Sequence, residues 1–283
     1  GIAHIGVINV LQENGFTINA IAGTSMGAMV GGVFASGTLP NFQKWLEDAD
    51  LKEAMKILDF SFSNPGFIKG EKLILKMQDF LPQASIENLP IPFTAIATDI
   101  LKQKEVVFSK GDIFEAIRAS ISIPSVFTPL VKNDQVLVDG GLINNIPINH
   151  VQKNDDDIVV AVCVNSDIPM TESYTNIMQI KGIEEKNVYI RDFNKLRNYI
   201  SNLIGRKKED KNENIIGQYE LIDRSIHMLL SEISNQIIKK YPPDILINLP
   251  RDLCGTFDFL KAKKIIEAGR LAALEQLKKL NLL

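Results

Sequence analysis

The strongest chemical signal in the sequence is the segment GTSMG at residues 23–27, which fits the pattern G-x-S-x-G around Ser25. An apolar run at residues 18–22 predicts a buried strand before it, and the small-residue run at 26–35 predicts a buried helix after it. In a sharp strand-to-helix turn, Gly23 and Gly27 let the backbone close while the serine hydroxyl projects from the sheet. The pattern is typical of a nucleophile elbow, although a serine that caps a helix between two packing glycines fits the same sequence pattern.

The predicted helix start could also stabilise the negative charge that forms when a serine attacks a carbonyl group. Unpaired N–H groups and a partial positive charge gather at a helix N-terminus, where they favour an oxyanion. The backbone N–H of Met26, the residue after Ser25, is therefore a candidate oxyanion donor.

A second candidate motif is Asp139-Gly140-Gly141, which directly follows the apolar run QVLV at residues 135–138. At the end of a sheet strand, the carboxylate of Asp139 would lie on the edge where α/β proteins build their sites. Asp-Gly-Gly is also a common turn with a purely structural role. Because a serine nucleophile needs a base, the presence of both motifs favours Asp139 as that base.

The three histidines, His4, His150 and His227, are the alternative bases. None follows a late strand, where a Ser-His-Asp hydrolase places its histidine, so we expect packing or capping roles, and His150 fits a triad best of the three. In a Ser-Asp dyad the site must desolvate the carboxylate, because an aspartate with an ordinary pKa is a weak base for a hydroxyl.

Composition narrows the class of protein. The chain has 283 residues, of which 45% are hydrophobic and 23% charged, so it fits one large globular α/β domain or a domain with an appendage. A net charge of -3 without a broad basic segment argues against nucleic acid, and no apolar run reaches the about 18 residues of a membrane span. Cys163, Cys254 and the scattered histidines lack metal-ligand spacing. We therefore expect a cytoplasmic protein without a metal or other cofactor.

Helical and strand patterns alternate through residues 1–165, which predicts a mainly parallel central sheet covered by helices. Residues 166–283 form a mostly helical portion. The phenylalanine-rich residues 60–67 predict a loop that either packs on the core or forms a lipid-facing lid. The predicted helices are 2–11, 26–35, 41–58, 112–120, 176–204, 216–241 and 258–280, and the predicted strands are 18–22, 91–98, 104–108, 135–138, 158–165 and 245–249.

Several segments, in a fixed order along the chain, resemble the bacterial patatin-like phospholipases. They are GIAHIGV at 1–7, GTSMG at 23–27, ATD at 97–99, ASISIP at 119–124, VF at 126–127 and DGG at 139–141. The resemblance covers about residues 1–165, and the closing strand and helix around 242–269 are also similar. It implies a three-layer patatin-like α/β fold in a single domain, residues 1–283, with the catalytic motifs in residues 1–165.

The resemblance also implies an acyl hydrolase of lipid esters, of the phospholipase A, lysophospholipase or esterase type, that needs no metal. Ser25 would be the nucleophile and Asp139 the base. Gly1 would be the last glycine of an oxyanion loop, and we expect the strand and glycine-rich turn that the family places before it to lie upstream of Gly1. An acyltransferase with the same acyl-serine, or a catalytically weak lipid-binding regulator, are the alternatives. The expected partner is a lipid or fatty-acyl ester, with peripheral membrane contact.

Overall fold

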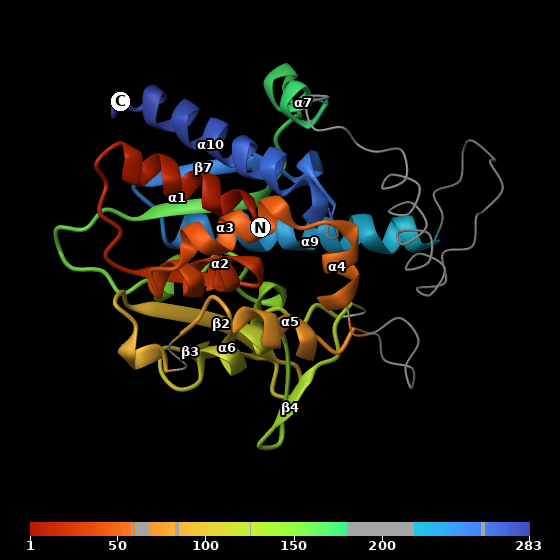
Figure 1. Cartoon of the computed structure of the whole chain (residues 1–283). Coiled ribbons are helices and arrows are strands. Elements are labelled where there is room, and N and C mark those ends of the chain that lie inside the picture. The colour runs from red at the N-terminus through yellow and green to blue at the C-terminus, as the bar shows by residue number, and fades with distance from the viewer. Residues whose placement is uncertain (58, 60–67, 83–84, 125, 180–217, 256–257) are drawn as a thin grey trace.

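The computed structural model describes residues 1–57, 59, 68–82, 85–124, 126–179, 218–255 and 258–283. Helices pack around two groups of strands, and α1 and α10 lie side by side on one side of the molecule (Figure 1). One large cluster of buried apolar side chains links α1, α2 and α10 to strands of both groups. The expected α/β class is therefore confirmed. In the described part of the chain, no helix is both long enough and apolar enough to cross a membrane.

The elements have the following bounds. The helices are α1 (Ala3–Glu13), α2 (Met26–Ala35), α3 (Leu39–Asp48), α4 (Leu51–Ile57), α5 (Glu71–Met77), α6 (Ile113–Ser120), α7 (Glu172–Gln179), α9 (Gln218–Lys240) and α10 (Ala262–Lys279). The strands are β1 (Ile21–Thr24), β2 (Phe93–Asp99), β3 (Lys104–Phe108), β4 (Leu130–Lys132), β5 (Gln135–Asp139), β6 (Val160–Ser166) and β7 (Ile245–Pro250).

Strand β2 is the centre of the larger sheet. β1 runs parallel to β2 along residues 93–96, β5 runs antiparallel to it along residues 97–99, and β3 runs antiparallel to it along residues 95–99. Because the register of β3 overlaps that of both other strands, β3 occupies one edge of β2, and β1 and β5 share the opposite edge. β4 then pairs with β5.

On their shared edge, β1 and β5 run toward each other. Thr24, the last residue of β1, lies opposite Ile96, and Asp139, the last residue of β5, lies opposite Ala97. The two strands therefore end at neighbouring positions of β2. This arrangement brings the two sequence motifs to one place in the fold.

The sheet is mixed, whereas the alternation of elements predicts a mainly parallel one. Parallel pairing occurs between β1 and β2 and between β6 and β7, which form a separate two-stranded sheet. The other pairings are antiparallel: short turns reverse the chain between β2 and β3 and between β4 and β5, and β5 also pairs antiparallel with β2. In the second turn Asn133 and Asp134 have φ values of 48° and 57°, as a two-residue hairpin requires.

Local capping explains where the helices differ from prediction. The helix expected at 41–58 is divided into α3 and α4, because Ala49 has an extended backbone and Asp50 accepts a hydrogen bond from the N–H of Glu53 at 2.8 Å. α7 begins earlier than the helix expected at 176–204. The rest of that prediction, and the loop expected at 60–67, lie outside the described residues.

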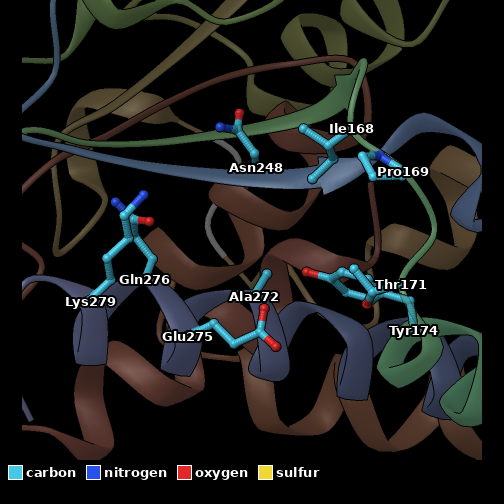
Figure 2. Close-up of a pocket in the computed structure, with 9 residues that line it drawn as sticks. All are labelled: Ile168, Pro169, Thr171, Tyr174, Asn248, Ala272, Glu275, Gln276 and Lys279. Carbon is cyan, nitrogen blue, oxygen red and sulfur yellow. The ribbon is translucent and has the colours of Figure 1, made fainter.

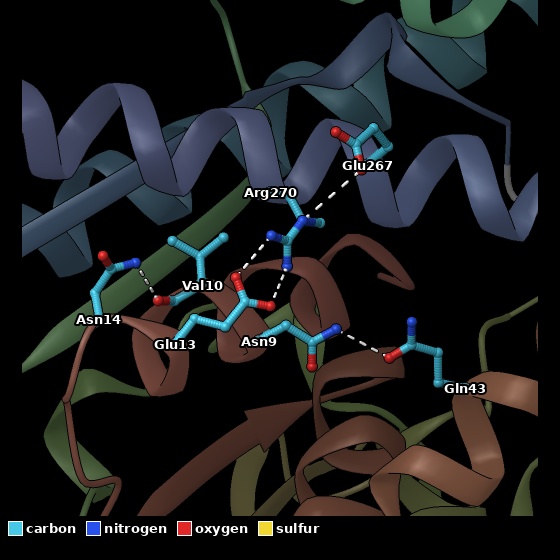
Figure 3. Close-up of polar contacts among 7 residues, drawn as sticks. All are labelled: Asn9, Val10, Glu13, Asn14, Gln43, Glu267 and Arg270. Carbon is cyan, nitrogen blue, oxygen red and sulfur yellow. Dashed lines mark hydrogen bonds and ion pairs between the residues drawn. The ribbon is translucent and has the colours of Figure 1, made fainter.

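Helices α1 and α10 pack at close range through glycines. A Cβ at Gly6 would overlap the backbone of Ile266, and a Cβ at Gly269 would overlap the backbone of Ala3. Beside this contact, Arg270 donates two hydrogen bonds of 2.7 Å to the carboxylate of Glu13 (Figure 3). Figure 3 also shows α1 bound to α3, through an amide hydrogen bond of 2.9 Å from Asn9 to Gln43. α1 is thus fixed on two sides, and its first turn lies next to the candidate site.

Candidate active site

Ser25 lies in the turn between β1 and α2, with a backbone φ of 56° and ψ of -126°. A non-glycine residue in this sparsely populated region costs about 1–3 kcal/mol and occurs where the surrounding structure imposes it. A Cβ at Gly23 would overlap the carbonyl group of Gly27, whereas a Cβ at Gly27 would come only within 3.9 Å of Nε2 of His4. The turn therefore needs a glycine at position 23, and at position 27 it has room for a side chain.

Asp139 ends β5 and is buried, with 6% of its surface exposed. Its Oδ1 accepts a hydrogen bond of 2.7 Å from the N–H of Gly141. The next residue, Gly140, lies so close to β2 that a Cβ there would overlap the carbonyl oxygen of Ile96. A glycine at position 140 is therefore needed to bring the end of β5 against β2.

The Ser25 hydroxyl lies close enough to Asp139 to affect its ionisation. Burial raises the pKa of Asp139 to about 6, and hydrogen bonding from the Ser25 hydroxyl and the Gly141 N–H opposes the rise. Oδ2 of Asp139 nevertheless has no partner within normal hydrogen-bond geometry, so the interaction with Ser25 is long or poorly aligned. A buried carboxylate with a free oxygen beside a serine hydroxyl can accept the hydroxyl proton after a small rotation of the serine.

The two residues expected to form an oxyanion site, Gly1 and Met26, are in contact. A Cβ at Gly1 would overlap the side chain of Met26. Met26 is the first residue of α2, so its N–H has no acceptor within the helix. The ring of His4 donates from Nδ1 to the carbonyl of Gly1, and burial lowers the pKa of His4 to about 4, which keeps the ring neutral at pH 7.

His150, the histidine that best fits a triad, lies elsewhere. Its Nε2 is 2.8 Å from Oε2 of Glu105, and Glu105 belongs to β3, on the edge of β2 opposite to Ser25. Asn144 donates a further hydrogen bond of 2.6 Å to the same carboxylate. The side chain of His227 lies outside the described part of the chain. Ser25 and Asp139 are thus brought together, and His150 is paired with a different carboxylate.

Sequence reasoning gave no role to the end of α6, which contacts both motifs. The hydroxyl of Ser120 accepts a hydrogen bond of 2.9 Å from the N–H of Ser25. Two residues later, the carbonyl of Ser122 accepts one of 2.9 Å from the N–H of Asp139. Serines that interrupt an apolar helix end are a signal for such contacts, although the sequence does not identify their partners.

A cavity of about 280 Å³ lies between α7, α10, β7 and the residues that follow β6 (Figure 2). Its lining consists of Ile168, Pro169, Thr171, Tyr174, Asn248, Ala272, Glu275, Gln276 and Lys279. Neither Ser25 nor Asp139 belongs to this lining. The chemistry therefore places the candidate active site at the ends of β1 and β5, away from this cavity.

Comparisons with known proteins agree with the motifs. The family model described as "Patatin-like phospholipase" matches residues 1–151. An uncharacterized NTE family protein of Mycobacterium tuberculosis is 31% identical over 98% of this chain and 88% of its own length. Lysophospholipase NTE1 of Pyricularia oryzae is 25% identical over 99% of this chain and 18% of its own length. Patatin-like phospholipase domain-containing protein 7 of the mouse is 32% identical over 59% of this chain and 13% of its own length. The chain belongs to the patatin-like phospholipase family.

Proposed function

We propose that this protein hydrolyses carboxylic esters of lipids, as a phospholipase A, lysophospholipase or esterase, through an acyl-serine. Family membership supports a lipid ester hydrolase, and one relative of the chain is named as a lysophospholipase. The observation that carries the finer proposal is the Ser25 hydroxyl beside the buried carboxylate of Asp139, whose pKa is raised to about 6. A carboxylate with this pKa is still ionised at pH 7 and is a stronger base than an ordinary aspartate.

In the acylation half of the reaction, Asp139 takes the hydroxyl proton of Ser25 while Oγ attacks the ester carbonyl carbon. The tetrahedral intermediate collapses when the bond to the leaving alcohol breaks and the alcohol takes the proton from Asp139. In the second half, a water molecule gives a proton to Asp139 and attacks the acyl-serine. The fatty acid leaves, and Ser25 recovers its proton.

The oxyanion of each intermediate needs hydrogen-bond donors next to the elbow. The N–H of Met26, at the start of α2, is the donor that the elbow itself supplies. Gly1 lies against Met26 and is held by His4, so the backbone at Gly1 is the second candidate. Loss of one such donor costs about 3–4 kcal/mol of transition-state stabilisation in comparable sites.

Exposed apolar side chains beside the dyad support a lipid substrate presented at a surface. Leu142 and Ile143 follow Gly141 directly and are 38% and 36% exposed. Such side chains could enter the outer part of a lipid aggregate while Ser25 reaches the ester. Peripheral contact with membranes is part of the proposal on this ground.

A fluorophosphonate probe tests the proposal, because it reacts only with an activated serine. We expect labelling of Ser25, identified by mass spectrometry, and loss of labelling in Ser25→Ala. Product analysis with a lysophospholipid, with and without a glycerol acceptor, then separates hydrolysis from acyl transfer. Absence of labelling in folded protein would leave a lipid-binding regulator as the better interpretation.

A further inference from the structure

The hydroxyl of Ser120 stands between the nucleophile turn and the central strand. It accepts a hydrogen bond of 2.9 Å from the N–H of Ser25 and donates one of 2.6 Å to the carbonyl of Ile96. Ile96 is the residue of β2 that lies opposite Thr24. The hydroxyl thus continues the pairing of β1 with β2 by one step, at the position where the backbone of Ser25 turns away from the sheet.

We propose that Ser120 is a positioning residue that holds Ser25 in its strained backbone conformation and at its separation from Asp139. The proposal rests on the proposed dyad for its catalytic consequence. Ser120 does not touch the reacting atoms. It acts through the backbone N–H of Ser25 on one side and, through Ile96, on the strand position against which Gly140 packs.

The conformation of Ser25 is one that needs external support. With φ at 56° and ψ at -126°, the residue persists only if its neighbours fix both of its peptide groups. The carbonyl of Ser25 accepts hydrogen bonds of 2.9 Å and 3.2 Å from Ala28 and Met29 of α2. The N–H of Ser25 is held by Ser120, so the two sides of the turn are fixed by different helices.

Ser120 is suited to this role because its own position is rigid. It is fully buried at the end of α6. Two residues earlier, Arg118 donates hydrogen bonds of 2.5 Å to the Ser122 hydroxyl and 2.8 Å to the carbonyl of Thr128. The same end of α6 binds Asp139 through the carbonyl of Ser122, so one helix terminus fixes both members of the dyad.

Hydrogen exchange of the wild-type protein gives the first test. The amide of Ser25 should be protected, whereas the amide of Met26, which has no acceptor within α2, should exchange at least about tenfold faster. In Ser120→Ala, exchange at Ser25 should approach that at Met26. An unprotected Ser25 amide in the folded wild type would overturn the proposal without any variant.

The second test is kinetic. Ser120→Ala should lower kcat about 10- to 100-fold with KM within about twofold, because the turn is misplaced while the lipid contacts remain. The rate of fluorophosphonate labelling at Ser25 should fall by the same factor. If Ser120→Ala does not fold, Ser120→Cys replaces it, since a thiol fills the site but forms weak hydrogen bonds.

The matched control is Ser166→Ala. Ser166 is buried like Ser120, but it lies at the end of β6, in the separate two-stranded sheet. Its hydroxyl donates a hydrogen bond of 2.7 Å to the side chain of Asn248. Rates are counted per folded molecule, so a loss of stability alone does not change them. Wild-type kcat and labelling in Ser120→Ala, or an equal loss in Ser166→Ala, would contradict the proposal. If the wild type is not labelled at Ser25, the proposed hydrolase is wrong, and the exchange measurement still decides whether Ser120 holds the turn.

Discussion

Ser25 and Asp139 meet because β1 and β5 approach each other along the same edge of β2, where Thr24 and Asp139 lie opposite the consecutive residues Ile96 and Ala97. The carboxylate that we propose as the base is thereby brought to the serine by a neighbouring strand end. In the proposed dyad, no histidine between the two residues is needed to carry the proton.

Substitution of the base tests this arrangement directly. Asp139→Asn should reduce turnover at least about 1,000-fold, nearly as much as Ser25→Ala, because an amide of the same shape cannot accept the hydroxyl proton. His150→Ala should retain most activity, since His150 is bound to Glu105. The activity of all three variants is measured as the steady-state rate of hydrolysis of a soluble ester. If His150→Ala were inactive and Asp139→Asn active, His150 and not Asp139 would be the base.

The pH dependence of the reaction should report the ionisation of Asp139. Because burial raises the pKa of Asp139 to about 6 and only the carboxylate is a base, kcat/KM should be level above pH 7 and fall about tenfold per pH unit below pH 6. The initial rate of fluorophosphonate labelling should follow the same curve. Activity that stays level down to pH 4 would mean that another group accepts the proton.

The raised pKa also predicts a cost in stability. The pKa of the carboxyl is about 6 in the folded protein and 3.8 ordinarily, so the fold loses stability as the pH rises from about 4 to about 6, and the loss is complete above pH 6. The difference of about 2 pKa units corresponds to about 3 kcal/mol at most. Asp139→Asn should therefore be more stable than wild type at pH 8 and of similar stability at pH 4.

Urea unfolding at the two pH values measures this difference. Ser25→Ala, which keeps the carboxylate, is the control and should retain the pH dependence. If Asp139→Asn is less stable at pH 8, the ionised carboxylate makes a net stabilising contribution in the fold, contrary to the raised pKa.

The two glycines of the elbow should differ in their tolerance of a side chain. Gly23→Ala should lower the free energy of unfolding by about 2 kcal/mol or more, because the methyl group overlaps the carbonyl of Gly27. Gly27→Ala should change it by about 1 kcal/mol or less, because the methyl group approaches only His4, at 3.9 Å. Chemical denaturation measures both, and equal losses would contradict the geometry of the turn.

Activity on aggregated lipid should depend on the apolar residues after the Asp-Gly-Gly motif. The double variant Leu142→Ser with Ile143→Ser should lose activity on micellar substrate and keep it on a monomeric short-chain ester. Val131→Ser is the matched control, since Val131 is 70% exposed on the outer strand β4. An equal effect on micellar and monomeric substrate would count against contact with a lipid surface.

The sequence predicts the two candidate catalytic residues better than the way in which they meet. Ser25 and Asp139 follow apolar strands and are flanked by glycines, and both signals are local. The direction of β5 relative to β4 follows from the hairpin at Asn133 and Asp134, and because neither residue is glycine, the sequence does not mark this turn and predicts a mainly parallel sheet. The contact of Ser120 with the nucleophile turn joins residues far apart in the chain, and composition and periodicity carry no information about such a pair.

The close contact of α1 with α10 affects the order in which the chain can fold. α1 carries His4 next to the nucleophile turn, and its glycine face at Gly6 is covered by α10, which lies far later in the sequence. During synthesis on the ribosome, α1 emerges early and must wait for α10 before its surface can be buried. The turn around Ser25 and the end of β5 can form first, while the segment around Gly1 is fixed when α10 docks. The proposed oxyanion site should therefore reach its final geometry only after α10 docks on α1.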